Sequence, residues 1–155
     1  MASKKSDRIR RQLEAYAFMS ERCAVCYFPR HLKAYRREAQ LHHLVGRRGG
    51  LDAHDHRNLI CVCTRCHEDY HQGHSQRPLT LGHMLQAKLE EDGEEMFDPV
   101  FLAKLLHRAG LKEDPKPLPA WVAEERVKNA RLLTSRAPFM EREGCRAKTT
   151  VAADA

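Results

Sequence analysis

The sequence predicts an α+β fold in which two short strands and one short helix form a small core. We expect an N-terminal helix and about three C-terminal helices to flank this core. Short apolar runs on either side of a glycine-rich segment indicate two strands within residues 40–63. Apolar residues recur at helical spacing in residues 7–20 and 78–133. Two Cys-x2-Cys pairs, in residues 23–26 and 63–66, indicate a metal ion that ties the upstream segment to the core.

The bulk composition suits a soluble globular protein. Of the 155 residues, 42% are apolar and 31% are charged, which argues against both a disordered chain and a membrane protein. The formal net charge is +6, so nucleic acid is a reasonable partner, although many basic proteins bind none. The N-terminal region lacks the apolar run of a signal peptide, and no stretch is long enough to span a bilayer. We therefore expect a cytoplasmic protein with no membrane partner.

Residues 1–20 are predicted to form a basic helical arm. From about Asp7 onward, Ile9, Leu13 and the Tyr16-Ala17 pair recur at helical spacing. Three arginines lie around them, at Arg8, Arg10 and Arg11. This basic side would lie either against phosphates or in solvent.

The core, residues 21–76, is predicted to run strand, loop, strand, helix. Residues 41–45 and 58–63 are short and apolar, as strands are. The glycines that follow the first strand favour a loop over residues 46–57, because glycine lowers the cost of unusual backbone dihedrals. Residues 64–71 indicate a short helix that a glycine closes.

Residues 77–135 are predicted as a helical extension, and 136–155 as a poorly ordered tail. The first helix of the extension should end before Gly93. The pair Asp98-Pro99 has the residue types of an N-cap and first helical position, so it should open a second helix. A third helix is expected over about residues 120–133.

The two cysteine pairs predict one structural zinc ion, held by Cys23, Cys26, Cys63 and Cys66. Zinc prefers four tetrahedral ligands, and two thiolates separated by two residues in a tight turn supply half of them. A reducing compartment favours metal ligands over disulfides. A redox pair would be a serious alternative for one such motif but not for two. Residues 63–67 also match the c-type haem attachment pattern, but that would require export and would leave the first pair unexplained.

Five polar residues form a second candidate site: His42, His43, Asn58, His67 and His71. Adjacent strand residues point to opposite faces, so His42 and His43 should have different roles, one toward a metal ion and one toward a substrate. His67 and His71 are four residues apart and share a helix face. A metal ion held there would keep positions open for water and a phosphate oxygen, as catalysis requires. A single histidine would be better explained as a surface residue, but the set favours catalysis.

These residues resemble the HNH endonuclease family, with its ββα-metal fold, in the branch that contains zinc. The match comprises His42-His43 as the first element, Asn58 as the central asparagine and Cys63-x2-Cys66-His67 as the closing element, with Cys23-x2-Cys26 upstream. It covers about residues 23–73. The small size is similar to stand-alone phage and bacterial HNH proteins, which implies a bacterial or phage-infected cell.

The resemblance implies a role for each residue. His43 would be the general base that takes a proton from the attacking water. His42 and His67 would hold one catalytic divalent metal ion, which could be Mg²⁺, Mn²⁺, Ni²⁺ or Zn²⁺. Asn58 would orient the loop and the base, and His71 would be either a further ligand or a phosphate contact. Cleavage would leave 5′-phosphate and 3′-hydroxyl ends, with the metal neutralising charge on the phosphoryl and leaving oxygens.

The remaining polar residues near the site are assigned to DNA or to solvent. Arg47, Arg48 and Arg57 flank the histidines, and guanidinium groups suit phosphates, so we expect these arginines to bind the DNA backbone without reading its sequence. Three other histidines are expected to be solvated: His54, His56 and His74.

The sequence thus predicts a metal-dependent DNA endonuclease or nickase. The alternative is a zinc-binding module that holds nucleic acid or protein without cutting. His43 beside His42 argues against this alternative, because a structural zinc domain has no use for an adjacent base.

Overall fold

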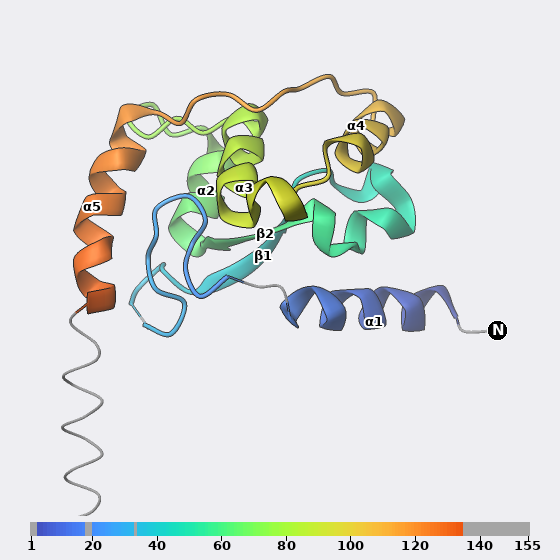
Figure 1. Cartoon of the computed structure of the whole chain (residues 1–155), viewed down its shortest axis with the longest axis horizontal. Coiled ribbons are helices and arrows are strands. Elements are labelled where there is room, and N and C mark those ends of the chain that lie inside the picture. Colours follow the sequence, from blue (N-terminus) through green and yellow to red (C-terminus); the bar gives the residue numbers. More distant parts are fainter. Residues whose placement is uncertain (1–2, 18–19, 33, 135–155) are drawn as a thin grey trace, which may run out of the picture.

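Strands β1 (Ala39–His43) and β2 (Leu59–Cys63) form an antiparallel pair at the centre of the molecule (Figure 1). The computed structural model describes residues 3–17, 20–32 and 34–134. Within these residues it contains this two-stranded sheet and five α-helices, which confirms the α+β class. The register pairs His42 with Ile60 and His43 with Leu59. Because β2 is buried along its whole length, a slip of one residue would turn every side chain of β1 to the wrong face.

Helix α2 (Thr64–Gln72) follows β2 directly and completes the predicted order of strand, loop, strand, helix. It ends at Gly73, whose φ of 68° lies in the left-handed region that favours glycine. The first strand begins and ends two residues earlier than the predicted 41–45. The reason is that Leu44 and Val45 turn toward Asn58. The Leu44 N–H donates to the Asn58 carbonyl, and the Val45 N–H donates to the side-chain Oδ1, each at 2.9 Å.

The segment between the strands forms short 3-10 helices where a loop was predicted for residues 46–57. These are η1 (Arg47–His54) and η2 (His56–Asn58). The Asp55 carboxylate caps η2, because it accepts from the Arg57 backbone N–H at 3.0 Å. The Asn58 side chain donates to the Ala53 carbonyl at 2.8 Å. These bonds satisfy backbone groups locally and so allow helical turns in a glycine-rich segment.

Four more helices surround the core. Helix α1 (Lys4–Ala17) begins before the predicted start at Asp7, because the Ser3 Oγ accepts from the Ser6 N–H at 3.2 Å and caps it. Helix α3 (Leu81–Met96) has a kink at the predicted stop, because Gly93 takes a non-helical φ of 73°, and a short helical segment follows to Met96. Helix α4 (Pro99–Arg108) starts at the predicted Asp98 cap, and α5 (Ala120–Thr134) lies where the third helix was expected.

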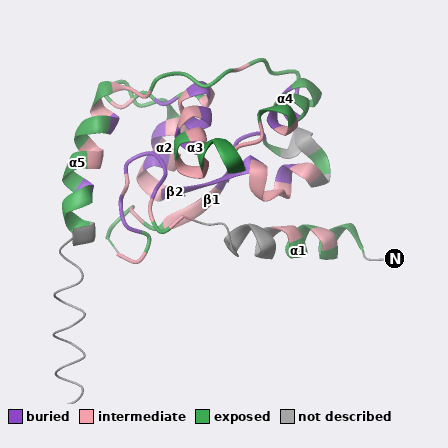
Figure 2. Ribbon diagram, in the orientation of Figure 1, coloured by how far each residue is buried: buried purple, intermediate pink, exposed green. Residues whose placement is uncertain are grey.

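The hydrophobic core joins the sheet to the Cys23–Cys26 turn and to the C-terminal helices. Its largest fully buried side chains include Val25, Val62, Met84, Leu105 and Val122. Figure 2 shows buried residues on this turn, on β2 and on the inner sides of α3 and α4. The helices of the predicted extension therefore share one core with the strands. The predicted tail, 136–155, lies outside the described residues, and none of the described helices has the length and apolarity needed to cross a membrane.

Helix α5 is fastened to the cysteine turn by polar contacts. Arg126 donates to the carbonyls of Val25 and Ala24 at 2.8 and 3.0 Å. Asn129 donates to the Cys26 carbonyl at 2.8 Å. Figure 1 shows α5 and α1 at opposite ends of the molecule, so α5 does not take part in the region around α1.

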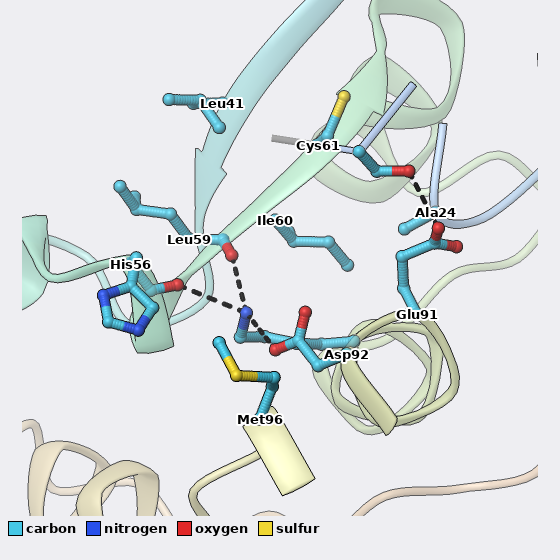
Figure 3. A pocket seen from close by; sticks show the side chains of 11 residues that line it. Ala24, Leu41, His56, Leu59, Ile60, Cys61, Glu91, Asp92 and Met96 are labelled. Carbon is cyan, nitrogen blue, oxygen red and sulfur yellow. Dashed lines mark hydrogen bonds and ion pairs between the residues drawn. The ribbon is translucent and has the colours of Figure 1, made fainter. Parts of the chain in front are cut away.

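A buried lysine ties α3 to the start of β2, and Figure 3 labels the three residues that it contacts, His56, Leu59 and Asp92. Lys88 is 3% exposed, and its Nζ donates to the carbonyls of His56 and Leu59 at 3.2 and 2.9 Å. The same Nζ pairs with the Asp92 carboxylate at 2.6 Å, beside a small cavity of about 240 Å³. Because its two carbonyl partners flank Asn58, Lys88 helps to set the position of that residue.

Candidate metal centres and active-site pocket

The four cysteines converge as the spacing predicted. Their side chains are buried, and their Sγ atoms lie within 4.8 Å of one another. Cys63 ends β2 and Cys66 lies in the first turn of α2, whereas the other two come from a tight turn. In that turn Tyr27 takes a φ of 64°, its N–H donates to the Cys23 carbonyl at 2.8 Å, and the Arg22 guanidinium covers its ring at 3.6 Å. The cluster could hold one structural zinc ion.

The charges around the sulfurs fit a bound cation. Four crowded thiols cannot all ionise alone, and their pKa values diverge accordingly. Hydrogen bonds from the other three cysteines lower the pKa of Cys63, whereas burial raises the pKa of Cys23. The Arg37 Nη1 lies 3.4 Å from the Cys26 Sγ and 3.7 Å from the Cys63 Sγ. A zinc ion at the centre would favour the thiolate form of all four.

A second layer of ion pairs surrounds the cysteine cluster. Arg37 and Arg77 both contact the Glu125 carboxylate, at 3.3 Å each. Arg77 also pairs with Asp69 of α2 at 2.8 Å, and its guanidinium lies 4.2 Å from the Trp121 ring. These side chains connect the cluster to both α2 and α5. Loss of a bound metal ion should therefore loosen these two helices as well as the cysteine turn.

Three histidines form the second cluster. His42 of β1 and His67 and His71 of α2 bring one ring nitrogen each within 4.8 Å of the others. The two α2 rings meet at 3.0 Å between their Nε2 atoms. The His42 Nε2 is buried and has no hydrogen-bond partner among the described residues. A buried imidazole nitrogen without a partner is unfavourable, so this atom suits a metal ligand.

The histidine cluster opens to solvent on one side, where His71 is exposed. Burial, followed by the charges of His67 and His71, lowers the pKa of His42 to about 3. Its ring therefore keeps a free lone pair at neutral pH. His42 is buried, His67 half-buried and His71 exposed. A metal ion bound here would face water on the His71 side. This arrangement brings His71, whose role the sequence left open, into the same cluster as the other two.

His43 lies on the opposite face of β1, as strand geometry predicted. Its Nε2 is 3.0 Å from the Nδ1 of His54. Burial and the neighbouring His54 lower the pKa of His43, and burial with Arg8 and Arg11 lowers the pKa of His54. The expectation that His54 is solvated was therefore wrong. It was missed because only the turn of η1 brings it back to β1, and no local pattern indicates that turn.

Asn58 is fully buried and holds the segment between the strands in place. Its Nδ2 donates to the Val45 and Ala53 carbonyls at 2.8 Å each, and its Oδ1 accepts from the Val45 N–H. All three of these side-chain bonds go to backbone groups. The geometry thus accounts for orientation of the loop, whereas no direct bond from the Asn58 side chain to His43 is found in the described part of the chain.

The three arginines expected to contact DNA have different surroundings. The side chains of Arg47 and Arg48 lie outside the described part of the structure. The Arg57 guanidinium pairs with Asp55 at 2.9 Å and Asp98 at 3.1 Å, and it covers the Phe101 ring at 3.8 Å. These contacts tie η2 to α4, so a phosphate contact by Arg57 stays a prediction that would have to compete with two carboxylates.

One cavity of about 940 Å³ connects the histidines to the N-terminal helix. Five histidines line it, namely His42, His43, His54, His67 and His71. Its other wall carries Lys4, Lys5 and Arg8 of α1. The basic side of this helix was visible in the sequence, but its position beside the histidines was not. Comparisons of the chain with protein-family models, with curated proteins and with solved structures find no match.

Proposed function

We propose that this protein is a metal-dependent DNA endonuclease or nickase of the HNH type, with a ββα-metal core and a structural zinc ion. One observation carries the proposal. Three histidine nitrogens converge on one side of β1, His43 occupies the other side, and all four rings line one cavity. Metal ligands and a candidate base thus share one open space, as hydrolysis of a phosphodiester requires.

His43 has the properties of a general base. Its lowered pKa leaves the imidazole neutral at pH 7, so it can accept a proton from a water molecule. The hydrogen bond to His54 limits rotation of the ring. Asn58 bonds the backbone of Val45, two residues after His43, and so fixes the chain where it leaves β1. The His54 contact and this backbone anchor together hold the base in place.

The histidine cluster has the properties of a catalytic rather than a structural metal site. His42, His67 and His71 supply three nitrogen donors, and exposure on one side leaves room for water and a phosphate oxygen. A divalent metal ion bound there would supply a Lewis acid that stabilises charge on the phosphoryl and leaving oxygens. A zinc-binding module without activity would need the buried cysteine cluster but not this second, open one.

Nicking of supercoiled plasmid by the purified protein tests the proposal. Reactions would contain Mg²⁺, Mn²⁺, Ni²⁺ or Zn²⁺ in turn, with the wild type, His43→Ala and a matched control, His107→Ala. His107 is exposed on α4, away from the histidine cavity. We expect the wild type and His107→Ala to nick in at least one metal, and His43→Ala to lose about 100-fold or more of the rate.

The products distinguish the mechanism. Nicks with 5′-phosphate and 3′-hydroxyl ends should be sealed directly by a DNA ligase. Absence of nicking in all four metals, or equal nicking by His43→Ala and the wild type, would refute the nuclease and favour the zinc-binding module.

A further inference from the structure

The groove beside the histidines has a cationic wall that the motif residues do not supply. Helix α1 lies against η1 and η2, and three of its side chains reach the 940 Å³ cavity: Lys4, Lys5 and Arg8. Arg8 is four positions from Lys4 and three from Lys5, so each lysine is a neighbour of Arg8 on the helix surface. The wall and the histidine cluster therefore face the same space from two sides.

The cations of α1 fall into two groups. Arg10 pairs with Asp7 at 3.5 Å, and Arg11 pairs with Asp52 of η1 at 3.1 Å. In the described part of the chain, Lys4, Lys5 and Arg8 are exposed and make no ion pair with a carboxylate. Arg11 thus anchors the helix, whereas the face turned to the cavity keeps its positive charge uncompensated.

The floor of the groove is open to a backbone-sized ligand. Gly46, Gly50 and Ala53 line it, and these three residues carry no side chain larger than a methyl group. A Cβ added at Gly46 or Gly50 would meet no heavy atom within 4 Å. A volume of about 940 Å³ is larger than one phosphate group needs, which favours a chain of phosphates over a small anion.

We propose that α1 forms the second wall of a nucleic-acid groove, and that Lys4, Lys5 and Arg8 bind backbone phosphates of the DNA held in it. The identity of this ligand as DNA rests on the proposed nuclease function. Successive phosphates and a row of long cationic side chains are complementary in charge, and such contacts position a strand without reading its bases. The ion pair between Arg11 and Asp52 holds α1 against η1, beside the histidines.

Salt-dependent binding of a fluorescein-labelled DNA duplex tests the inference. Anisotropy would be measured without added divalent metal, so that DNA is bound and not cut, between about 50 and 200 mM NaCl. The variant replaces all three residues (Lys4→Gln, Lys5→Gln, Arg8→Gln). A control replaces three exposed lysines elsewhere (Lys104→Gln, Lys112→Gln, Lys128→Gln) and removes the same charge.

We expect the α1 variant to lose at least about tenfold in affinity, and its slope of log K against log salt to become shallower by about 2 to 3. The control should keep nearly the wild-type slope. The conservative variant Lys4→Arg, Lys5→Arg, Arg8→Lys should keep binding, and helical circular dichroism should show that α1 still forms.

Each of the other possible results shows whether this inference, the nuclease proposal or both have failed. Equal losses in the α1 variant and the control would overturn the inference, because they would show a diffuse charge effect. Unchanged binding by the α1 variant, in a protein that nicks plasmid, would overturn the inference alone. Loss of binding in the α1 variant would support the groove even if the wild type nicks nothing. Absence of DNA binding by the wild type would overturn both.

Discussion

Asn58 offers the sharpest test of how the core is held together. Its side chain is fully buried and bonds the backbone of Val45 twice and that of Ala53 once. Asn58→Ala would leave three buried backbone groups without partners. Asn58→Asp keeps nearly the same shape but turns a second oxygen toward two carbonyl oxygens. We therefore expect the aspartate to be the more harmful replacement above neutral pH.

The magnitude follows from the three bonds. Each buried group left without a partner costs about 1 to 3 kcal/mol, so the loss of three partners in Asn58→Ala should lower the free energy of unfolding by at least about 3 kcal/mol. In Asn58→Asp the carboxyl must keep a proton to fit, which raises its folded-state pKa from about 4 to about 7 or above. At 1.36 kcal/mol for each pKa unit, that is about 4 kcal/mol, and one carbonyl still lacks a donor.

Urea unfolding of zinc-loaded protein, followed by circular dichroism, measures both effects. A folded-state pKa above the unfolded value means that the folded state binds the extra proton. The stability of Asn58→Asp is therefore lost as pH rises, by about 1 kcal/mol between pH 6 and pH 8, relative to the wild type. Asn58→Ala should stay parallel to the wild type over this range. Loss of less than about 1 kcal/mol in Asn58→Ala, or no extra pH dependence in Asn58→Asp, would refute this account.

Three further predictions concern the residues around the two clusters. Lys88→Met should lower the free energy of unfolding by about 2 to 3 kcal/mol in the same urea assay, because two carbonyls and a half-exposed carboxylate lose their donor; an unchanged midpoint would contradict this. Arg37→Ala should speed zinc release to a chromogenic chelator by about tenfold, whereas Lys112→Ala should match the wild type; equal rates would show that the guanidinium does not stabilise the thiolates. Burial, and then His54, lower the pKa of His43. In His54→Ala this pKa should rise toward 6.5, so the acid limb of the pH profile of nicking should shift to higher pH. An unchanged acid limb would argue against coupling between His43 and His54.

Local patterns predicted the elements and the cysteine cluster well. A turn with two cysteines and a strand end with two more must meet if one metal ion is to be bound. The spacing of the cysteines was therefore sufficient to predict the cluster. Alternation along β1 separated His42 from His43 correctly, since strand geometry is fixed by the backbone. The start of α1 was missed because the Ser3 cap has the same residue type as many exposed serines.

Features that depend on distant segments could not be predicted in this way. His54 meets His43 because the 3-10 turns reverse the chain, and Lys4 lines the same cavity because α1 packs against η1 and η2, with Arg11 paired to Asp52. Arg57 was expected to be available to phosphates, yet one of its partners, Asp98, lies 41 residues further along the chain. Pairings of this kind are tertiary, and residue type and spacing do not encode them locally.

The bonds from α5 to the cysteine turn bear on the order in which the protein folds during synthesis. Asn129 and Cys26 are 103 positions apart, so their contact closes a loop that contains most of the described chain. At about 5 to 20 residues per second, the ribosome needs on the order of 5 to 20 seconds to make the intervening chain. The four cysteines are all synthesised well before α5. Sheet pairing, together with binding of any zinc ion that the cysteines take up, can therefore precede docking of the last helix, and a newborn chain would pass through a stage in which the carbonyls of the turn still face water.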